Sequence, residues 1–385
     1  MQPSYKTMDE HQHVFNLIWS QMSEMQKRTS SSWWFFILFP KEAEGYGPRQ
    51  MMFSIATRVG ERIRISDVWL PGVDLSRSIQ NGVDEFPAQA LGWYYDGQQV
   101  HEDIVKETAV THMSLADKNI HLWNEQENGE ELGYEISAVP HKPLTLAAHI
   151  KGDKGEAHFE AWGDLDCLDS SPHESINIDT PIAGTHFIAW RRMNFKGKFN
   201  LPGTGQETLE GLCYFQRVCL NVPLFPWKWI WAFFPDGSVF SAYVPYVGLN
   251  LFRKGYKFFN SNRKEQATLP IGGTAFWDWN GAAERIWLKN CRVTPILGRG
   301  PHPQFKVETR NKQGDYINFL AAPYGHTRFF IDRPILRGRK ESHWNYNEYM
   351  FRMQSLDGRI QGQPITQETM GQGFGSLEYT WGLGL

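Results

Sequence analysis

The stretch Met193–Val218 reads MNFKGKFNLPGTGQETLEGLCYFQRV, and Pro223–Phe240 continues as PLFPWKWIWAFFPDGSVF. Short runs of apolar and aromatic residues are separated here by turn signals, first at Gly203–Gly205 and then at Asp236-Gly237. Runs of this length joined by short glycine-containing turns are typical of hairpins. The stretch therefore predicts an antiparallel meander of strands.

The same rhythm extends outward over most of the chain. Trp33–Phe39 (WWFFILF) has the composition of a buried strand, and Met51–Arg58 and Trp93–Tyr95 are followed by Val59-Gly60 and Asp96-Gly97. After the first helix no long stretch repeats with a 3.6-residue period, which disfavours βαβ units and a nucleotide-binding doubly wound sheet. We therefore predict an all-β protein built of antiparallel barrels or sandwiches.

Residues 1–29 are predicted to form an amphipathic helix, the one clear exception to the strand pattern. The apolar residues that recur there at helical spacing are Val14, Ile18, Met22 and Met25. Farther along, Leu251–Pro270 carries five Lys and Arg and little alternation, so we place the inter-domain linker there. This divides the remainder into an N-terminal β domain, 30–255, and a smaller C-terminal barrel, 270–385.

The composition limits the classes of ligand. There are 39 Lys and Arg against 42 Asp and Glu, so no overall basic field is present to hold nucleic acid. Aromatic residues make up 14% of the chain, with 16 Trp, 14 Tyr and 25 Phe. These types are favoured in strands and in apolar ligand pockets, so a hydrophobic small molecule is the expected ligand.

The expected compartment is the cytoplasm. The first thirty residues lack the basic start and apolar run of a secretory signal. The four cysteines, Cys167, Cys213, Cys219 and Cys291, form no CxxC pair and are interpreted as reduced thiols. The apolar stretch Val218–Phe234 is interrupted by prolines and a lysine and does not span a bilayer, although its tryptophans would suit transient contact with a membrane surface.

The order of elements in Trp190–Phe240 resembles the lipocalin-like superfamily that contains carotenoid 1,2-hydratase (hydroxyneurosporene synthase), AttH-like proteins, tocopherol cyclase and lipocalin-like Diels-Alderases. The C-terminal half is similar too, through Phe276–Trp279 (FWDW), Phe305–Thr309, Tyr346–Tyr349 and the closing GFGSLEYTWG around Glu378. The resemblance implies two lipocalin-like barrels or sandwiches side by side, with an apolar pocket at their interface.

The resemblance also implies a class of chemistry: alkene hydration, chromanol ring closure or pericyclisation. The hydratase-like and cyclase-like members carry a WG pair that is missing near Gln216–Leu220, so no single activity is carried over. Such reactions need little covalent machinery. A carboxylic acid kept protonated in an apolar pocket could donate a proton to an alkene, and aromatic faces could stabilise the resulting cation.

The acid candidates are the carboxylates embedded among large side chains: Glu348, Glu378 and Asp278. For each of them the alternative is an ordinary surface or ion-paired carboxylate. His343, within SHWNY, is a further catalytic candidate because histidine titrates near neutral pH. His326 and His186 have similar claims, and each histidine has a structural role as its alternative.

Tryptophans supply the candidate ligand-binding residues. Trp227, Trp229 and Trp231 alternate, so on a strand they share one face, where they either line a pocket or fill a core. Trp277 and Trp279 repeat the arrangement with Asp278 on the opposite face of their strand. Tyr346 completes the candidate ligand-binding set.

Several classes of site have no motif here. A GxSxG elbow, a P-loop and a GxGxxG between a strand and a helix are all missing, and the histidines lack metal-ligand spacing such as HExxH. Neither a cofactor nor a metal is predicted.

Three functions remain open at this point. The first is an enzyme, a lyase (hydratase) or an isomerase (cyclase), that acts on an isoprenoid or related hydrophobic substrate by proton donation and by holding a reactive conformer. The second is a non-catalytic carrier of the same kind of ligand. The third is carbohydrate recognition by exposed tryptophans. The first two differ in whether a pocket carboxylate or histidine is essential.

Overall fold

The computed structural model describes residues 8–19, 31–58, 62–65, 67–70, 79–80, 83–163, 173–179, 184–221, 226–248, 268–279, 285–296, 301–335 and 340–381. The chain divides into two compact units, the first being Met1–Ile63 with Val68–Pro223 and the second Arg64–Asp67 with Leu224–Leu385. None of the described helices is long and apolar enough to cross a membrane.

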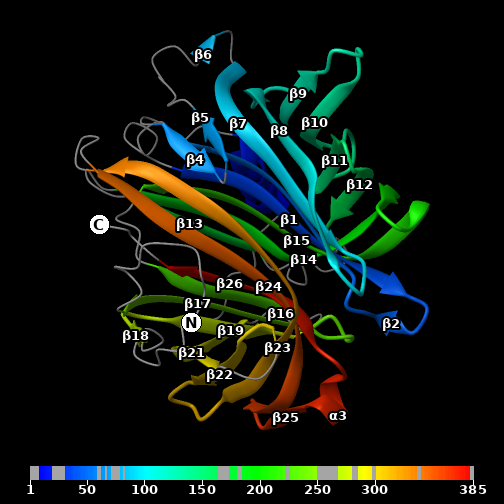
Figure 1. Ribbon diagram of the computed structural model, residues 1–385. Helices are drawn as coiled ribbons and strands as arrows, with labels where there is room; N and C mark the ends of the chain where they lie inside the picture. The colour runs from blue at the N-terminus through cyan, green and yellow to red at the C-terminus, as the bar shows by residue number, and fades with distance from the viewer. Residues whose placement is uncertain are drawn as a thin grey trace. The chain divides into compact units, whose positions relative to one another are not determined.

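The first unit begins with a short helix and continues as strands (Figure 1). Its elements are α1 Met8–Asn16, the 3-10 turn η1 Leu17–Trp19, β1 Ser31–Glu42, β2 Gly45–Tyr46, β3 Gln50–Arg58, β5 Val68–Leu70, β6 Ile79–Gln80, β7 Val83–Tyr95, β8 Val100–Ser114, β9 Asn119–Glu125, β10 Glu131–Ala138, β11 Thr145–Gly152, β12 Gly155–Trp162, β13 His173–Asp179, β14 Gly184–Leu201 and β15 Gly205–Asn221. The strand β4, Ile63–Ile65, lies at the division between the units.

Ten strands of the first unit close into an antiparallel barrel. Their order is β12-β11-β10-β9-β8-β7-β3-β1-β15-β14, and β12 pairs with β14 to complete the ring. At that seam Gly197 of β14 lies opposite Phe159 of β12. A Cβ atom at Gly197 would lie 2.2 Å from the carbonyl oxygen of His158, so only glycine allows the two strands to approach this closely.

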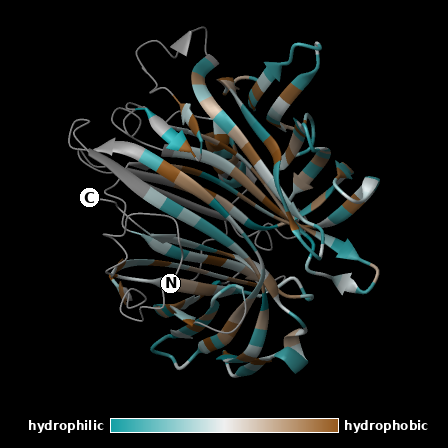
Figure 2. Ribbon diagram, viewed as in Figure 1, coloured by the Kyte–Doolittle hydropathy of each residue, from teal (hydrophilic) through white to brown (hydrophobic). Residues whose placement is uncertain are grey.

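The barrel interior holds the hydrophobic core of the first unit. Alternating residues of each strand point inward. In β9, for example, Ile120 and Leu122 belong to the core, whereas their neighbours His121 and Trp123 are less buried. Figure 2 shows the resulting alternation of hydrophobic and hydrophilic residues along the strands. The N-terminal elements also contribute, because Val14 of α1 and Ile18 of η1 belong to this core, as the amphipathic pattern predicted.

The helix is shorter in the described chain than the sequence predicted. We expected it to run to about residue 28, but α1 ends at Asn16 and is followed by one 3-10 turn. The indole nitrogen of Trp34 donates a hydrogen bond to the carbonyl oxygen of Ile18 in that turn, at 3.0 Å. The rest of the predicted helix, including Met22 and Met25, lies outside the described residues.

The second unit is also made of antiparallel strands. Its elements are β16 Trp227–Phe233, β17 Val239–Gly248, β18 Thr268–Pro270, β19 Thr274–Asp278, β20 Arg285–Leu288, β21 Asn290–Ile296, β22 Gln304–Arg310, β23 Tyr316–Ile335, β24 Lys340–Ile360, β25 Gln363–Thr366, the short helix α3 Gln367–Met370, and β26 Phe374–Trp381. The main order is β20-β19-β17-β16-β26-β24-β23-β22-β21. Because β20 and β21 stand at opposite ends of this order yet are joined by Lys289 alone, the sheet curls back on itself around a second core.

The prediction of an all-β fold with two antiparallel β units and a short N-terminal helix is confirmed. The division between the units differs from the one expected at Leu251–Pro270. β16 and β17 pair with β26 and β19, so they belong to the second unit, whose main segment is Leu224–Leu385. The expected linker lies largely outside the described residues. The tight turns at Asp96-Gly97 and Asp236-Gly237 are present, with both glycines at positive φ.

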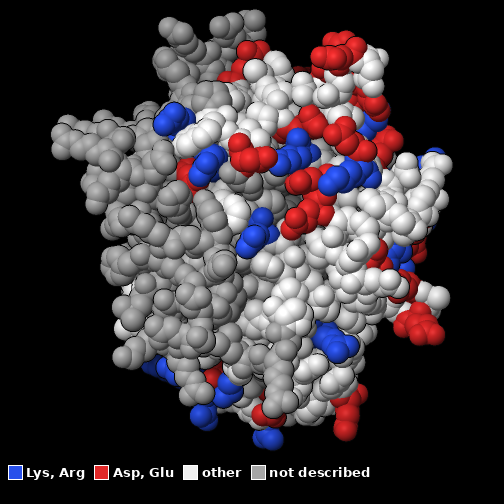
Figure 3. Space-filling model, viewed as in Figure 1, with Lys and Arg blue, Asp and Glu red and all other residues white. Residues whose placement is uncertain are grey.

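Charged groups of both signs are interspersed on the face shown in Figure 3. No field of a single sign covers the residues described on that face, in keeping with a formal net charge of −3 for the whole chain. Strong attraction of a polyanion to this face is therefore not expected.

Candidate functional site

The last strand, β26, has one apolar and one polar face, and both are buried. Leu377, Tyr379 and Trp381 belong to the core of the second unit. Ser376 and Glu378 alternate with them and point to the other side of the sheet, yet both are at most 4% exposed. Buried polar groups are costly unless they are hydrogen-bonded, so this face is a candidate site.

Glu378 lies at the centre of this polar face. In the strand register it stands opposite Trp229 of β16 on one side and opposite Glu348 of β24 on the other. The indole nitrogen of Trp227 donates a hydrogen bond of 2.7 Å to Oε2 of Glu378, and the hydroxyl of Tyr346 also bonds this carboxyl group. Burial raises the pKa of Glu378 to about 7, although both hydrogen bonds act to lower it. Near neutral pH this carboxyl group is therefore partly protonated.

Glu348 is the second buried carboxylate. It has no exposed surface, and the hydroxyl of Ser376 donates a hydrogen bond of 3.1 Å to its Oε1. Residues directly opposite on antiparallel strands have Cβ atoms roughly 4.5–5.5 Å apart. Glu348 and Glu378 therefore form a pair of neighbouring carboxyl groups on one face of the sheet.

Aromatic rings surround this pair. The ring of Trp227 lies 5.4 Å from that of Trp344 and 6.1 Å from that of Tyr346, between ring centroids. Trp229 and Trp231 follow Trp227 on the same face of β16 and are also buried. The predicted alternation of the three tryptophans, with Lys228 and Ile230 on the other face, is what the register shows.

Trp277 and Trp279 lie elsewhere. Trp277 belongs to the core of the second unit and Trp279 packs against that core, their rings 5.2 Å apart in an edge-to-face contact. Asp278 points to the opposite face of β19, as expected, but its carboxylate is bound by Arg285 through contacts of 2.9 and 3.1 Å. Because this carboxylate is engaged by Arg285, Asp278 is a weaker acid candidate than Glu378.

Of the three candidate histidines, His326 has a described side chain, and it does not contact Glu378. His326 faces the core, where its ring stacks on Tyr349 and its Nε2 lies 3.0 Å from Oδ1 of Asn347. Burial lowers the pKa of His326 to about 4, which keeps it neutral at physiological pH. His343 and His186 lie on β24 and β14, but their side chains are outside the described residues.

The chain is similar at low sequence identity to several solved structures. A putative AttH from Nitrosomonas europaea has 13% identity and a TM-score of 0.49, covering 90% of this chain and 91% of that one. Kievitone hydratase from Nectria haematococca has 12% identity and a TM-score of 0.39, with 94% and 92% covered. CghA with Sch210972 has 8% identity and a TM-score of 0.45, with 92% and 89% covered.

No protein-family model matches the chain, and no curated protein matches it. At identities of 13% or less and TM-scores below 0.5, no activity, substrate or site residue is transferred to this chain. The pocket expected at the interface of the two units stays a prediction.

Sequence reasoning missed three residues of this region. Trp344 and Ser376 contact the site, but neither type is distinctive on its own. Lys228 is also buried, on the core side of β16, where its Nζ donates a hydrogen bond of 2.6 Å to the carbonyl oxygen of Val293. Burial lowers the pKa of Lys228 to about 7. A lysine between two tryptophans of a strand was the one available signal, since charged residues are rare at such positions.

Proposed function

We propose that this protein is an enzyme that acts on a hydrophobic substrate, an isoprenoid or a related polyene or polyketide, by proton transfer at the Glu348–Glu378 pair. The observation that carries the proposal is the buried carboxyl group of Glu378, whose pKa is raised to about 7 beside a second buried carboxylate. A general acid works best when its pKa is close to the operating pH. The reaction class is hydration or cyclisation of an alkene, a lyase or isomerase activity.

In the proposed step, the protonated carboxyl of Glu378 donates its proton to one carbon of a substrate double bond. The other carbon becomes a carbocation, which the faces of Trp227 and Trp229 stabilise. Glu348 then accepts a proton, either from a water molecule that adds to the cation or from a neighbouring carbon or hydroxyl group as a ring closes. Proton exchange between the two carboxyl groups restores the starting state, so the step consumes no oxidant or reductant.

The contacts of the two carboxyl groups support different roles for them. Glu378 is hydrogen-bonded by aromatic side chains and is favoured in its neutral form by burial. Glu348 accepts a hydrogen bond from the hydroxyl of Ser376. This bond holds the Oε1 atom of Glu348 in place for the role of proton acceptor. Two carboxyl groups in different environments are a recurrent way of dividing acid and base roles.

The test begins with the ligand. The full chain would be purified from an isoprenoid-producing host and analysed by native mass spectrometry and solvent extraction, with Trp229→Ala and Trp277→Ala as a matched pair. We expect a co-purifying polyene-like or quinone-like molecule that Trp229→Ala loses and a folded Trp277→Ala retains. The extracted molecule would then be incubated with wild type, Glu378→Gln and Glu348→Gln.

The proposal predicts turnover by wild type and a rate at least 100-fold lower in both carboxamide variants, with ligand binding retained, because one acid or base group typically contributes about 10²–10⁴-fold. Binding without turnover in wild type would instead establish a carrier of the same ligand. Absence of any extractable ligand, together with unchanged behaviour of Trp229→Ala, would contradict a hydrophobic site at this face.

A further inference from the structure

The outer face of the first barrel carries a row of ionisable side chains that crosses seven neighbouring strands. Each member stands opposite the next in the strand register. In order the row is Glu85, His112, His121, Glu135, His149, His158 and Lys198. The inward neighbours of these residues, such as Ile120, Ile136 and Ile150, fill the core, so the row faces outward.

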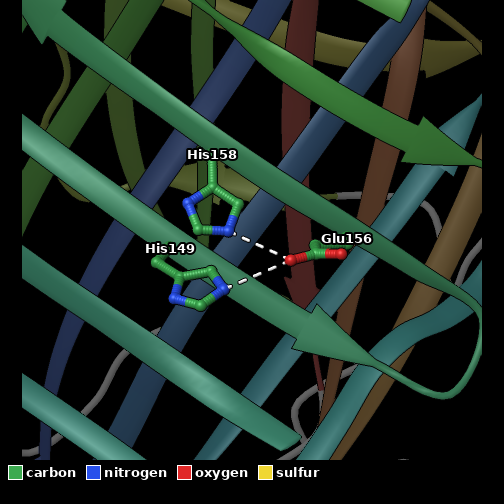
Figure 4. A group of neighbouring side chains, drawn as sticks. All are labelled: His149, Glu156 and His158. Atoms are coloured by element: carbon green, nitrogen blue, oxygen red, sulfur yellow. Dashed lines mark hydrogen bonds and ion pairs between the residues drawn. The ribbon is translucent and has the colours of Figure 1, made fainter. Parts of the chain in front are cut away.

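Three side chains at one end of this region form a compact group (Figure 4). His149 of β11 stands opposite His158 of β12, and Glu156 lies two residues before His158, which places it on the same face. Oε1 of Glu156 lies 3.0 Å from Nε2 of His158 and 3.5 Å from Nε2 of His149. The two imidazole rings stack with their centroids 3.6 Å apart.

We propose that His149, Glu156 and His158 bind a divalent transition-metal ion of the Zn²⁺ class. Imidazole nitrogen and carboxylate oxygen are ordinary ligands of such ions. One ligand atom from each residue lies within 4.8 Å of the other two. Ligands around a tetrahedral ion, with bonds of about 2.0–2.2 Å, lie roughly 3.4 Å apart, so small side-chain rotations bring all three onto one ion.

The placement of the three groups favours a cation as their shared partner. The Nε2 atoms of both histidines converge on Oε1 of Glu156. A metal ion satisfies both nitrogens and the carboxylate at once. The hairpin β11–β12 holds the three residues on paired strands, which fixes their spacing before the ion arrives.

The site opens into a groove, which leaves room for a ligand beyond the protein. The groove has a volume of about 590 Å³ and is lined by both histidines, Glu135, Trp162, Lys196 and Lys198. Three protein ligands leave one position of a tetrahedral ion open. Lys196 and Lys198 lie in the same groove, so water or a small anion such as a carboxylate is the group expected at that position.

Zinc titration of the EDTA-treated full-length protein tests the proposal directly. We expect calorimetry to show one Zn²⁺ per chain and an affinity at least about tenfold lower in each of His149→Ala, Glu156→Gln and His158→Ala. His121→Ala is the matched control, because it removes a histidine of the same row that is not one of the three ligands. It should bind Zn²⁺ as wild type does.

A second readout locates the ion. The ring of Trp123 lies 4.8 Å from that of His149, so bound Cu²⁺ should quench an emission component that is missing in Trp123→Phe. Failure of wild type to bind Zn²⁺ at millimolar concentration would overturn the proposal, as would unchanged stoichiometry and affinity in the three ligand variants. Loss of binding in His121→Ala alone would place the ion elsewhere on the row and overturn it as well.

Discussion

Glu348 and Glu378 stand directly opposite each other on β24 and β26, and neither side chain is more than 4% exposed. Two ionised carboxylates at this spacing in a buried site would repel each other strongly. Burial raises the pKa of Glu378 to about 7, so near neutral pH this member of the pair is partly protonated. This relationship connects the fold of the second unit to its proposed chemistry.

Glu378 should make the stability of the protein depend on pH. Burial raises the pKa of Glu378 in the folded state to about 7 from its ordinary value of 4.5, so between these values the folded protein binds more protons than the unfolded chain. The stability that Glu378 contributes is therefore fully present below about pH 4.5 and is lost as the pH rises through 7. The loss is on the order of 3 kcal/mol. Urea unfolding from pH 4.5 to 8 should show this decline in wild type and a flatter profile in Glu378→Gln.

Lys228 should produce a pH dependence of opposite sign. Its folded-state pKa is lowered to about 7 from 10.5, so between these values the unfolded chain binds more protons. Stability should rise with pH from about 7 to 10 through this group. Lys228→Met, which keeps a long apolar side chain beside Tyr246 and Tyr379, should remove the rise. The free energy of unfolding would be measured in urea between pH 7 and 10. An equal rise with pH in the variant and in wild type would be evidence against a neutral buried lysine.

Closure of the first barrel should depend on Gly197. Its replacement by Val would put a Cβ atom 2.2 Å from the carbonyl oxygen of His158, so β12 and β14 would have to separate. We expect a loss of roughly 1–3 kcal/mol in stability, the usual cost of overpacking. Thermal unfolding measures the loss. Gly203→Ala is the control, because an added Cβ at Gly203 meets nothing within 4 Å. The positive φ of Gly203 adds backbone strain to this control variant. A smaller loss at Gly197 than at Gly203 would contradict the seam.

Trp229 of β16 and Trp277 of β19 should respond differently to replacement by alanine. Trp277 is fully buried in the core of the second unit and contacts Phe234 and Trp279. Trp277→Ala should cost about 3–5 kcal/mol of stability and leave the ligand of the folded protein unchanged. Trp229→Ala should lower ligand retention instead. Chemical unfolding combined with ligand extraction of the two variants separates these outcomes. Loss of ligand in Trp277→Ala but not in Trp229→Ala would contradict the assignment of Trp229 to the ligand site and of Trp277 to the core.

The sequence predicted the fold class because strand composition and turn signals are local. Trp33–Phe39 lies within β1, and both Asp-Gly turns are where the pattern placed them. The division between units was misplaced because it depends on pairing: β16 is assigned to the second unit through β26, about 150 residues farther along the chain. No local pattern in Leu224–Gly248 indicates that partner.

The same distinction applies to the sites. Glu348 and Glu378 were selected because large side chains flank them, but their position opposite each other needed the register of β24 and β26. The aromatic neighbours that also made Trp277 and Trp279 candidates reflect a core, which has the same composition as a pocket. The group of His149, Glu156 and His158 was missed because its members gather only when β11 and β12 pair.

The protonation state of Glu378 is the most direct test of the proposed acid. Infrared difference spectroscopy of the full-length protein, titrated from pH 5 to 9, detects a protonated buried carboxyl group by its carbonyl stretch. The account predicts one such band in wild type that disappears with a midpoint near pH 7 and is missing in Glu378→Gln, whereas Asp278→Asn retains it. A wild-type spectrum without the band at pH 5 to 6, or a band that Glu378→Gln leaves unchanged, would contradict the central claim.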